Sequence, residues 1–203
     1  MTNTPLVSAA ELASRLTDPD WLVVDCRAEL SDRDAGARAW QAGHIPGAIH
    51  ADLERELSAP VTPVTGRHPL PPIDTFVDTL SRWGVAAATR VVAYDAGNSA
   101  YAARLWWMLR YVGHDAVAVL DGGFAAWVEQ GHPVSTAAVT RAPARFVARP
   151  RPQMLCDARG VAEALARGEL LVDVRGAERF VGKVEPLDSV AGHIPGAVNL
   201  PFT

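Results

Sequence analysis

The stretch from Val91 to Trp127 constrains the fold most, because it alternates apolar strands with helices. An apolar segment over 91–94 runs into a short loop, and the loop opens directly into a helix that we expect to reach Arg110. A second apolar segment over 116–120 and a helix that starts at glycine follow. This alternation predicts an α/β fold with a mostly parallel central sheet flanked by helices.

The loop after the first of these strands is the candidate site. Its residues are Asp95, Ala96, Gly97, Asn98, Ser99 and Ala100. A loop between the carboxyl end of a parallel strand and a helix N-terminus is where α/β proteins bind ligands. Its backbone N–H groups converge and the helix end adds partial positive charge, so the geometry suits an anion or a thiolate. The loop begins with Asp95, itself an anion, whose role is therefore the central question.

Composition limits the class of protein. The chain has 203 residues, of which 49% are hydrophobic and 21% charged, with a net charge of −4. These values are ordinary for a globular chain with one large domain or one and a half small ones. No basic stripe stands out, so we expect no nucleic-acid partner. Without a long apolar run or a signal peptide, we expect no membrane partner and a cytoplasmic location.

The two cysteines, Cys26 and Cys156, show no CxxC spacing and no neighbouring histidine cluster. We therefore expect no metal site and no metal cofactor. A disulfide between them is not expected in a reducing cytosol. Since Cys26 lies in an apolar strand, we predict that it is a small semi-buried core residue.

Local signals predict where several helices begin and end. Ser8 and Glu11 have the spacing of a capping box, which predicts a helix from this point. Asp74 is predicted to cap a helix that stops near Gly84. The polar segment over 27–38 is expected to be irregular.

Two segments of the chain recur in the same order. The strand over 22–27 returns at 170–175, which is 148 residues later. The segment Ala-Gly-His-Ile-Pro-Gly-Ala over 42–48 returns letter for letter at 191–197, which is 149 residues later. Two ordered matches at nearly one offset predict an internal duplication.

The duplication predicts a complete N-terminal domain over 1–134, a linker over 135–152 and part of a second such domain over 153–203. The loop that corresponds to the candidate site would begin about forty residues beyond Thr203, so we expect the chain to be cut before it. Half a domain buries too little apolar surface to offset its chain entropy. We therefore expect the partial domain to pack on the first domain, to pair with another copy in a homo-oligomer, or to belong to a longer chain.

These features resemble the rhodanese family of two-domain sulfurtransferases. The motifs that carry the resemblance are the Val-Val-Asp-Cys-Arg strand end, both Gly-His-Ile-Pro-Gly-Ala segments, Trp106-Trp107-Met108, and Leu120-Asp121-Gly122-Gly123-Phe124. The resemblance implies transfer of sulfur, as a cysteine persulfide, from thiosulfate or 3-mercaptopyruvate to cyanide or a thiol. It implies no metal and no organic cofactor.

The resemblance also implies roles for single residues. In such tandem proteins only the second domain carries the catalytic cysteine, and Asp95 stands at the corresponding position of the first. A carboxylate can accept the hydrogen bonds of a thiolate but cannot form a persulfide, so this chain is expected to hold no catalytic residue and to be inactive. Arg179 matches the arginine that binds the anionic donor. Asp188 stands where enzymes that prefer 3-mercaptopyruvate have a second arginine, which favours thiosulfate.

Other conspicuous residues are predicted to be structural. Arg27 and Arg175 end equivalent strands in both repeats, so each is expected to pair with a carboxylate. His44 and His193 lie in identical turns and are expected to bond to the backbone rather than to catalyse. The tryptophans at 106 and 107 are expected to pack a helix on the sheet.

Two functions other than sulfur transfer are compatible with this type of fold. The alternative is a non-catalytic rhodanese-like protein that binds an anion or a partner. A phosphatase on the same fold would need an arginine six positions after its cysteine, but Asp32 and Ala162 occupy these positions after Cys26 and Cys156. The phosphatase interpretation therefore has no support.

Overall fold

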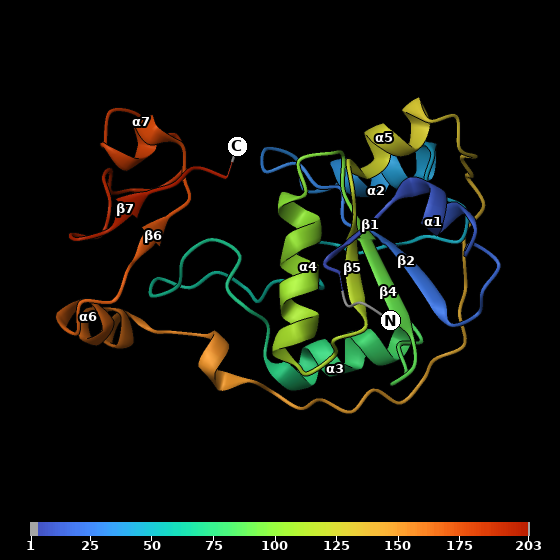
Figure 1. Cartoon of the computed structure of the whole chain (residues 1–203), viewed down its shortest axis with the longest axis horizontal. Helices are drawn as coiled ribbons and strands as arrows, with labels where there is room; N and C mark the ends of the chain where they lie inside the picture. Colours follow the sequence, from blue (N-terminus) through green and yellow to red (C-terminus); the bar gives the residue numbers. More distant parts are fainter. Residues whose placement is uncertain (1–3, 203) are drawn as a thin grey trace. The chain divides into compact units, whose positions relative to one another are not determined.

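A computed structural model of the chain describes residues 4–202. It divides the chain into two compact units, Met1–Arg151 and Pro152–Thr203, which we call the first and second unit (Figure 1). No helix among the described residues is long and apolar enough to cross a lipid bilayer.

The first unit is built on a five-stranded parallel sheet. In the order in which they lie side by side, its strands are β1 (Leu6–Val7), β5 (Val117–Leu120), β4 (Arg90–Tyr94), β2 (Trp21–Asp25) and β3 (Ile49–His50). Every neighbouring pair is parallel. The predicted α/β fold with a parallel sheet is therefore confirmed.

Helices cover both faces of this sheet. They are α1 (Ala9–Ala13), α2 (Ala35–Ala42), α3 (Ile73–Arg82), α4 (Ala100–Tyr111) and α5 (Gly123–Glu129). Alternate residues of a strand point to opposite faces, and the side chains of β4 accordingly divide between the two faces of the sheet. Ala93 belongs to the core with α3 and α4, whereas Val92 and Tyr94 belong to the core with α1 and α5. All three are fully buried, so the central strand contributes side chains to both hydrophobic cores.

The predicted start of α1 at Ser8 is confirmed, because Ser8 is the N-cap and its hydroxyl accepts the N–H of Glu11 at 3.2 Å. The prediction that Asp74 caps α3 is wrong: Pro72 is the N-cap and Asp74 lies in the first turn. Pro72 has extended backbone angles (φ −51°, ψ 144°) that lead straight into the helix, so α3 begins one residue before Asp74.

The prediction that residues 27–38 are irregular is wrong at its end, where α2 begins at Ala35. Tertiary contacts stabilise this helix. A Cβ at Gly36 would lie 1.9 Å from the carbonyl oxygen of Arg27, so only glycine allows the helix to approach the chain after β2. The indole of Trp40 donates a 2.9 Å hydrogen bond to the carbonyl of Ala48.

The second unit repeats the start of the first. Its elements are a 3₁₀ turn η1 (Pro152–Met154), α6 (Ala158–Ala166), β6 (Val172–Asp173), α7 (Ala177–Phe180) and β7 (Val198–Asn199). β6 and β7 are parallel and pair Val172 with Val198, as β2 and β3 pair Val24 with Ile49. Val172 lies 148 residues after Val24, and Val198 lies 149 residues after Ile49. The strand pairing therefore follows the offsets of the sequence repeat.

Residues 135–151, the last part of the first unit, run as an extended segment against the rest of that unit, and we call them the strap (Figure 1). At its start, backbone hydrogen bonds of 2.9 and 2.8 Å join Ser135 and His44. Phe146 is buried in the core beneath α3 and α4. At its end, the N–H of Arg151 donates to the carbonyl of Tyr111 at 2.8 Å. Residues 135–151 of the segment predicted as a linker therefore belong to the first unit.

The two cysteines differ in environment. Cys26 is 1% exposed, and burial, together with the carboxylates of Asp25 and Asp95, raises the pKa of its thiol well above the usual value. Cys156 is exposed, and both are free thiols. The prediction that Cys26 is a core residue is confirmed, and its thiol is poorly suited to be a nucleophile.

Candidate functional site

The candidate site loop lies where expected, between the carboxyl end of β4 and the start of α4. Asp95 is 1% exposed, and its carboxylate is turned into the loop that it begins. Oδ1 accepts the N–H groups of Gly97 and Ser99, both at 3.0 Å. Oδ2 accepts those of Tyr101 and Ala102, at 3.0 and 3.2 Å. The loop and the first turn of α4 thus direct four backbone donors at one carboxylate.

A neighbouring loop supports this arrangement from the end of β5. The N–H of Phe124 donates to the carbonyl of Asp95 at 2.8 Å, and that of Ala125 donates to the carbonyl of Ala96 at 3.1 Å. Gly123 has a φ of +58°, and a Cβ there would lie 2.7 Å from the Asp95 carbonyl oxygen. The Asp-Gly-Gly-Phe motif therefore needs glycine at 123 to let the two loops touch.

The four donors are already used by a group of the loop itself. A carboxylate carries a full negative charge, so each of these hydrogen bonds is charge-assisted. The start of α4 adds the positive end of its dipole. An external anion could bind these N–H groups only by displacing the Asp95 side chain, which the backbone of the loop and of the first turn of α4 holds in place.

Beside this loop, a buried ion pair holds the carboxyl end of β2. Asp25 is fully buried, and Arg27 contacts both of its oxygens, with Nη2 to Oδ2 at 2.6 Å. The same Nη2 donates to the carbonyl of Gly43 at 2.6 Å. The Tyr94 hydroxyl donates to Asp25 Oδ2 at 2.7 Å and accepts the N–H of Ile45. This network ties the repeated Gly-His-Ile-Pro-Gly-Ala segment to two central strands.

The second unit contains the same clamp. Arg175 contacts both oxygens of Asp173, with Nη2 to Oδ2 at 2.7 Å. Its Nη2 also donates to the carbonyl of Gly192 at 2.6 Å. The expectation that Arg27 and Arg175 each pair with a carboxylate is therefore confirmed.

Arg179, the predicted donor-binding residue, is held by two carboxylates of the second unit. Its Nη2 lies 2.8 Å from Glu185 Oε1 and 2.9 Å from Asp188 Oδ2, and its Nε donates to Glu185 Oε2 at 3.2 Å. Glu185 also accepts the N–H groups of Leu187 and Asp188. Hydrogen bonds from Arg179 lower the pKa of Glu185 to about 2, so this carboxylate stays ionised near neutral pH.

Glu185 was missed by reasoning from the sequence. It joins the two arginines, because it also lies 3.4 Å from Arg175 Nη1. Its segment over 183–189 has no counterpart in the repeated motifs, so no internal comparison indicated it. The structure places Arg179 in the second unit and the Asp95 loop in the first.

The remaining conspicuous residues have structural contacts. His44 is fully buried, and its two ring nitrogens lie 2.7 Å from the carbonyl of Trp40 and 3.1 Å from that of Ala137. His193 bonds to the carbonyl of Phe180 at 2.7 Å. Trp106 and Trp107 lie on α4, are partly buried and pack against the core. No group of three side chains suited to hold a metal ion occurs among residues 4–202.

Comparison with known proteins agrees with this architecture. The family described as "Rhodanese-like domain" matches residues 8–130. "Probable 3-mercaptopyruvate sulfurtransferase" of Pseudomonas aeruginosa is 47% identical over 206 residues, covering 100% of this chain and 72% of the relative. "Putative thiosulfate sulfurtransferase SseB" of Mycobacterium tuberculosis is 40% identical, covering 97% and 70%.

A solved structure shows the same fold. The crystal structure of SseA from Escherichia coli, described among the 3-mercaptopyruvate sulfotransferases, superposes with a TM-score of 0.86 at 35% identity. The match covers 98% of this chain and 75% of that one. The chain belongs to the rhodanese family, and its relatives are sulfurtransferases, which act between a sulfur donor and a sulfur acceptor.

The Asp95 contacts predict a large stability loss on truncation. Asp95→Ala removes the acceptor of four N–H groups, two of them in the first turn of α4. We expect a loss of about 2–4 kcal/mol in the free energy of unfolding of the first unit, since four N–H groups, one of them on the buried Ala102, would lose a charged acceptor. The measurement is urea unfolding followed by tryptophan fluorescence, because all six tryptophans lie in the first unit.

The matched control for this variant is Asn98→Ala in the same loop. The Asn98 side chain accepts one exposed N–H, that of Ala100 at 3.1 Å, so its loss should cost less than about 1 kcal/mol. Equal unfolding midpoints for Asp95→Ala and Asn98→Ala would contradict the structural role of the Asp95 carboxylate.

Proposed function

We propose that the chain serves a sulfurtransferase that moves a sulfane sulfur from a small anionic donor to cyanide or a thiol through a cysteine persulfide. In this proposal, the cysteine that forms the persulfide is not among residues 1–203. The first unit supplies a folded but non-nucleophilic site loop, and the second unit supplies Arg179 for the donor. The observation that carries the proposal is the Asp95 carboxylate bound by four backbone N–H groups.

The chemistry of persulfide formation explains why this observation matters. A cysteine thiolate attacks the outer sulfur of thiosulfate, the S–S bond of the donor breaks, and sulfite leaves with the electron pair. Convergent N–H donors and a helix N-terminus favour such a thiolate by lowering the pKa of its thiol. Asp95 offers the same negative charge to the same type of loop, but its oxygen cannot become a persulfide. In this proposal the loop still stabilises a negative charge, but it cannot form a persulfide.

Neither of the two cysteines of the chain is suited to the reaction. Cys26 is buried, and its thiol has a pKa raised well above the usual value. Cys156 is exposed and lies directly before Asp157, the N-cap of α6, whose side chain already accepts the N–H of Gly160 at 2.7 Å. Neither thiol lies in a loop whose N–H groups converge on sulfur.

Arg179 is the proposed binding group for the donor. Its Nε and Nη2 are held by Glu185 and Asp188, which fixes the plane of the guanidinium and leaves Nη1 without a protein acceptor among the described residues. A planar guanidinium binds the oxygens of thiosulfate or of a carboxylate through paired hydrogen bonds. Nη1 can donate at once, and the second bond of the pair, from Nη2, requires the anion to take the place of the Asp188 carboxylate. Thiosulfate and 3-mercaptopyruvate both carry such an anionic end, and the names of the relatives include both donors.

The alternative is a non-catalytic protein that binds an anion at the Asp95 loop. The geometry disfavours it, because the N–H groups that would hold the anion are occupied by the Asp95 carboxylate. A second negative charge beside this buried carboxylate would also be repelled.

Turnover of the purified 203-residue chain tests the proposal. We expect no thiocyanate from cyanide with thiosulfate as donor, and no pyruvate from 3-mercaptopyruvate with a thiol as acceptor, above the rates without protein. The physical reason is the absence of a cysteine in a thiolate-stabilising loop. Turnover that disappears in Cys156→Ser or in Cys26→Ser would contradict the proposal, because one of these thiols would then carry the sulfur.

Affinity for the donor tests the role of Arg179. Asp188→Asn removes a carboxylate that lies 2.9 Å from Arg179 Nη2 and competes with an anion for the same guanidinium. We expect thiosulfate to bind about threefold more tightly to this variant, since the replaced ion pair is partly exposed. The measurement is the shift of the Arg179 Nε–H signal in NMR titrations with thiosulfate and with pyruvate.

The matched control removes one negative charge elsewhere in the same unit. Glu178 pairs with Lys183 at 2.7 Å, and both side chains are exposed, so Glu178→Gln should leave the titration unchanged. An Arg179 signal that does not move with either anion, in the parent chain and in Asp188→Asn alike, would contradict donor binding at this residue.

A further inference from the structure

The strap concentrates positive charge on a chain that is acidic elsewhere. Between Gln130 and Cys156 there are four arginines and no aspartate or glutamate. The whole chain has a net charge of −4, so the rest of it carries −4 − 4 = −8. The net charge of the whole chain hides this contrast, because it sums the arginines of the strap with the more numerous acidic residues elsewhere.

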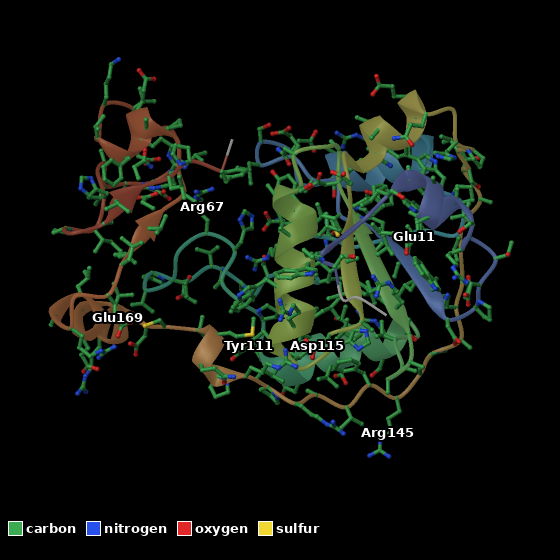
Figure 2. All side chains as sticks on the ribbon, in the orientation of Figure 1. Glu11, Arg67, Tyr111, Asp115, Arg145 and Glu169 are labelled. Atoms are coloured by element: carbon green, nitrogen blue, oxygen red, sulfur yellow. The ribbon has the colours of Figure 1, made fainter. Side chains whose placement is uncertain are left out.

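The extended path of the strap brings two of these arginines onto one face. Alternate residues face opposite sides of an extended chain. Phe146 and its neighbours at 144 and 148 face the first unit, whereas Arg145, Val147 and Arg149 are exposed. Figure 2 shows the Arg145 side chain pointing away from the ribbon. Four residues of extended chain separate Arg145 from Arg149 by roughly 13 Å along the backbone.

In the described part of the chain, neither of these two side chains has a partner. Within residues 4–202 no hydrogen bond or ion pair is formed by the guanidinium of Arg145 or of Arg149. The backbone N–H groups of Arg145 and Val147 also donate to no described residue. By contrast, the backbone N–H of Arg149 donates to the carbonyl of Val112 at 2.8 Å, and that of Phe146 donates to the Ser81 hydroxyl. The strap is therefore fixed in place while its outer edge remains open.

A groove of about 480 Å³ lies beside this edge. Arg145, Val147 and Arg149 form one side of it, and the turn at Gly113 contributes to the other. Its one acidic residue, Asp115, is paired with Arg151 at 2.5 Å and with Arg110 at 3.6 Å. The groove thus presents a positive charge to whatever binds there.

We propose that this edge of the strap binds an extended acidic segment of a partner protein. Such a segment can pair its backbone with the open N–H groups of the strap, as an added strand pairs with a sheet edge. Its carboxylates would meet the guanidiniums of Arg145 and Arg149. An apolar side chain between them would cover Val147, which is 62% exposed. The surface lies wholly in the first unit and does not depend on the proposed sulfur transfer.

Binding of a labelled peptide with alternating glutamate and valine, followed by fluorescence anisotropy, tests this proposal. We expect the wild-type chain to bind the peptide with an affinity that falls as salt is raised, because the contacts are exposed ion pairs. The double variant R145Q/R149Q should bind about fivefold more weakly. It should also keep the parent thermal unfolding midpoint, since neither guanidinium has a partner among residues 4–202.

The matched control variant is R33Q/R159Q, which removes the same charge from two other exposed arginines and should bind like the wild type. A control peptide with glutamine in place of glutamate should not bind. Equal affinity of R145Q/R149Q and wild type, or equal binding of the glutamine peptide, would overturn the proposal. So would tighter binding of a single-stranded oligonucleotide than of the acidic peptide, or self-association of the wild type that R145Q/R149Q abolishes.

Discussion

The ion pair between Asp25 and Arg27 is the interaction on which the arrangement of the first unit depends. A buried carboxylate without a partner would cost several kcal/mol, so the fold keeps Asp25 only with its hydrogen bonds satisfied. Arg27 satisfies it and in turn holds the Gly43 carbonyl, while Tyr94 links the same carboxylate to the N–H of Ile45. The end of β2, the end of β4 and the turn before β3 are therefore fixed together. The same clamp recurs in the second unit, so the duplication preserved an interaction as well as a sequence.

This fixed edge positions the Asp95 loop. Asp95 directly follows Tyr94, so the residue that completes the clamp also sets where the loop begins. The loop then directs its N–H groups inward, and the glycine-containing turn after β5 closes against it. A loop of this kind stabilises a negative charge, whichever atom carries it. With a carboxylate at this position the loop is structural, whereas with a thiolate it would be reactive.

The sequence predicts the main features of this fold because they depend on local patterns. Apolar runs marked β2 and β4, and the internal repeat predicted that Arg27 and Arg175 would have equivalent partners. The start of α2 was missed, because contacts of Gly36 and Trp40 with distant residues stabilise that helix. Glu185 was missed because it lies in a segment without an internal counterpart. The exposed face of the strap could not be predicted, because the sequence of this segment does not alternate regularly between apolar and polar residues. Only its extended path in the structure shows that alternate residues are exposed.

The thiol pKa of an Asp95→Cys variant tests the central claim most directly. The measurement is the absorbance of the thiolate as a function of pH, in a Cys156→Ser background where Cys26 remains buried. If the loop is a thiolate-stabilising site occupied by a carboxylate, the four N–H donors outweigh the cost of burial. The new thiol then ionises below about pH 7.5, compared with about 8.5 for a free cysteine. A pKa at or above that of a free cysteine would show that burial dominates, and would contradict the account.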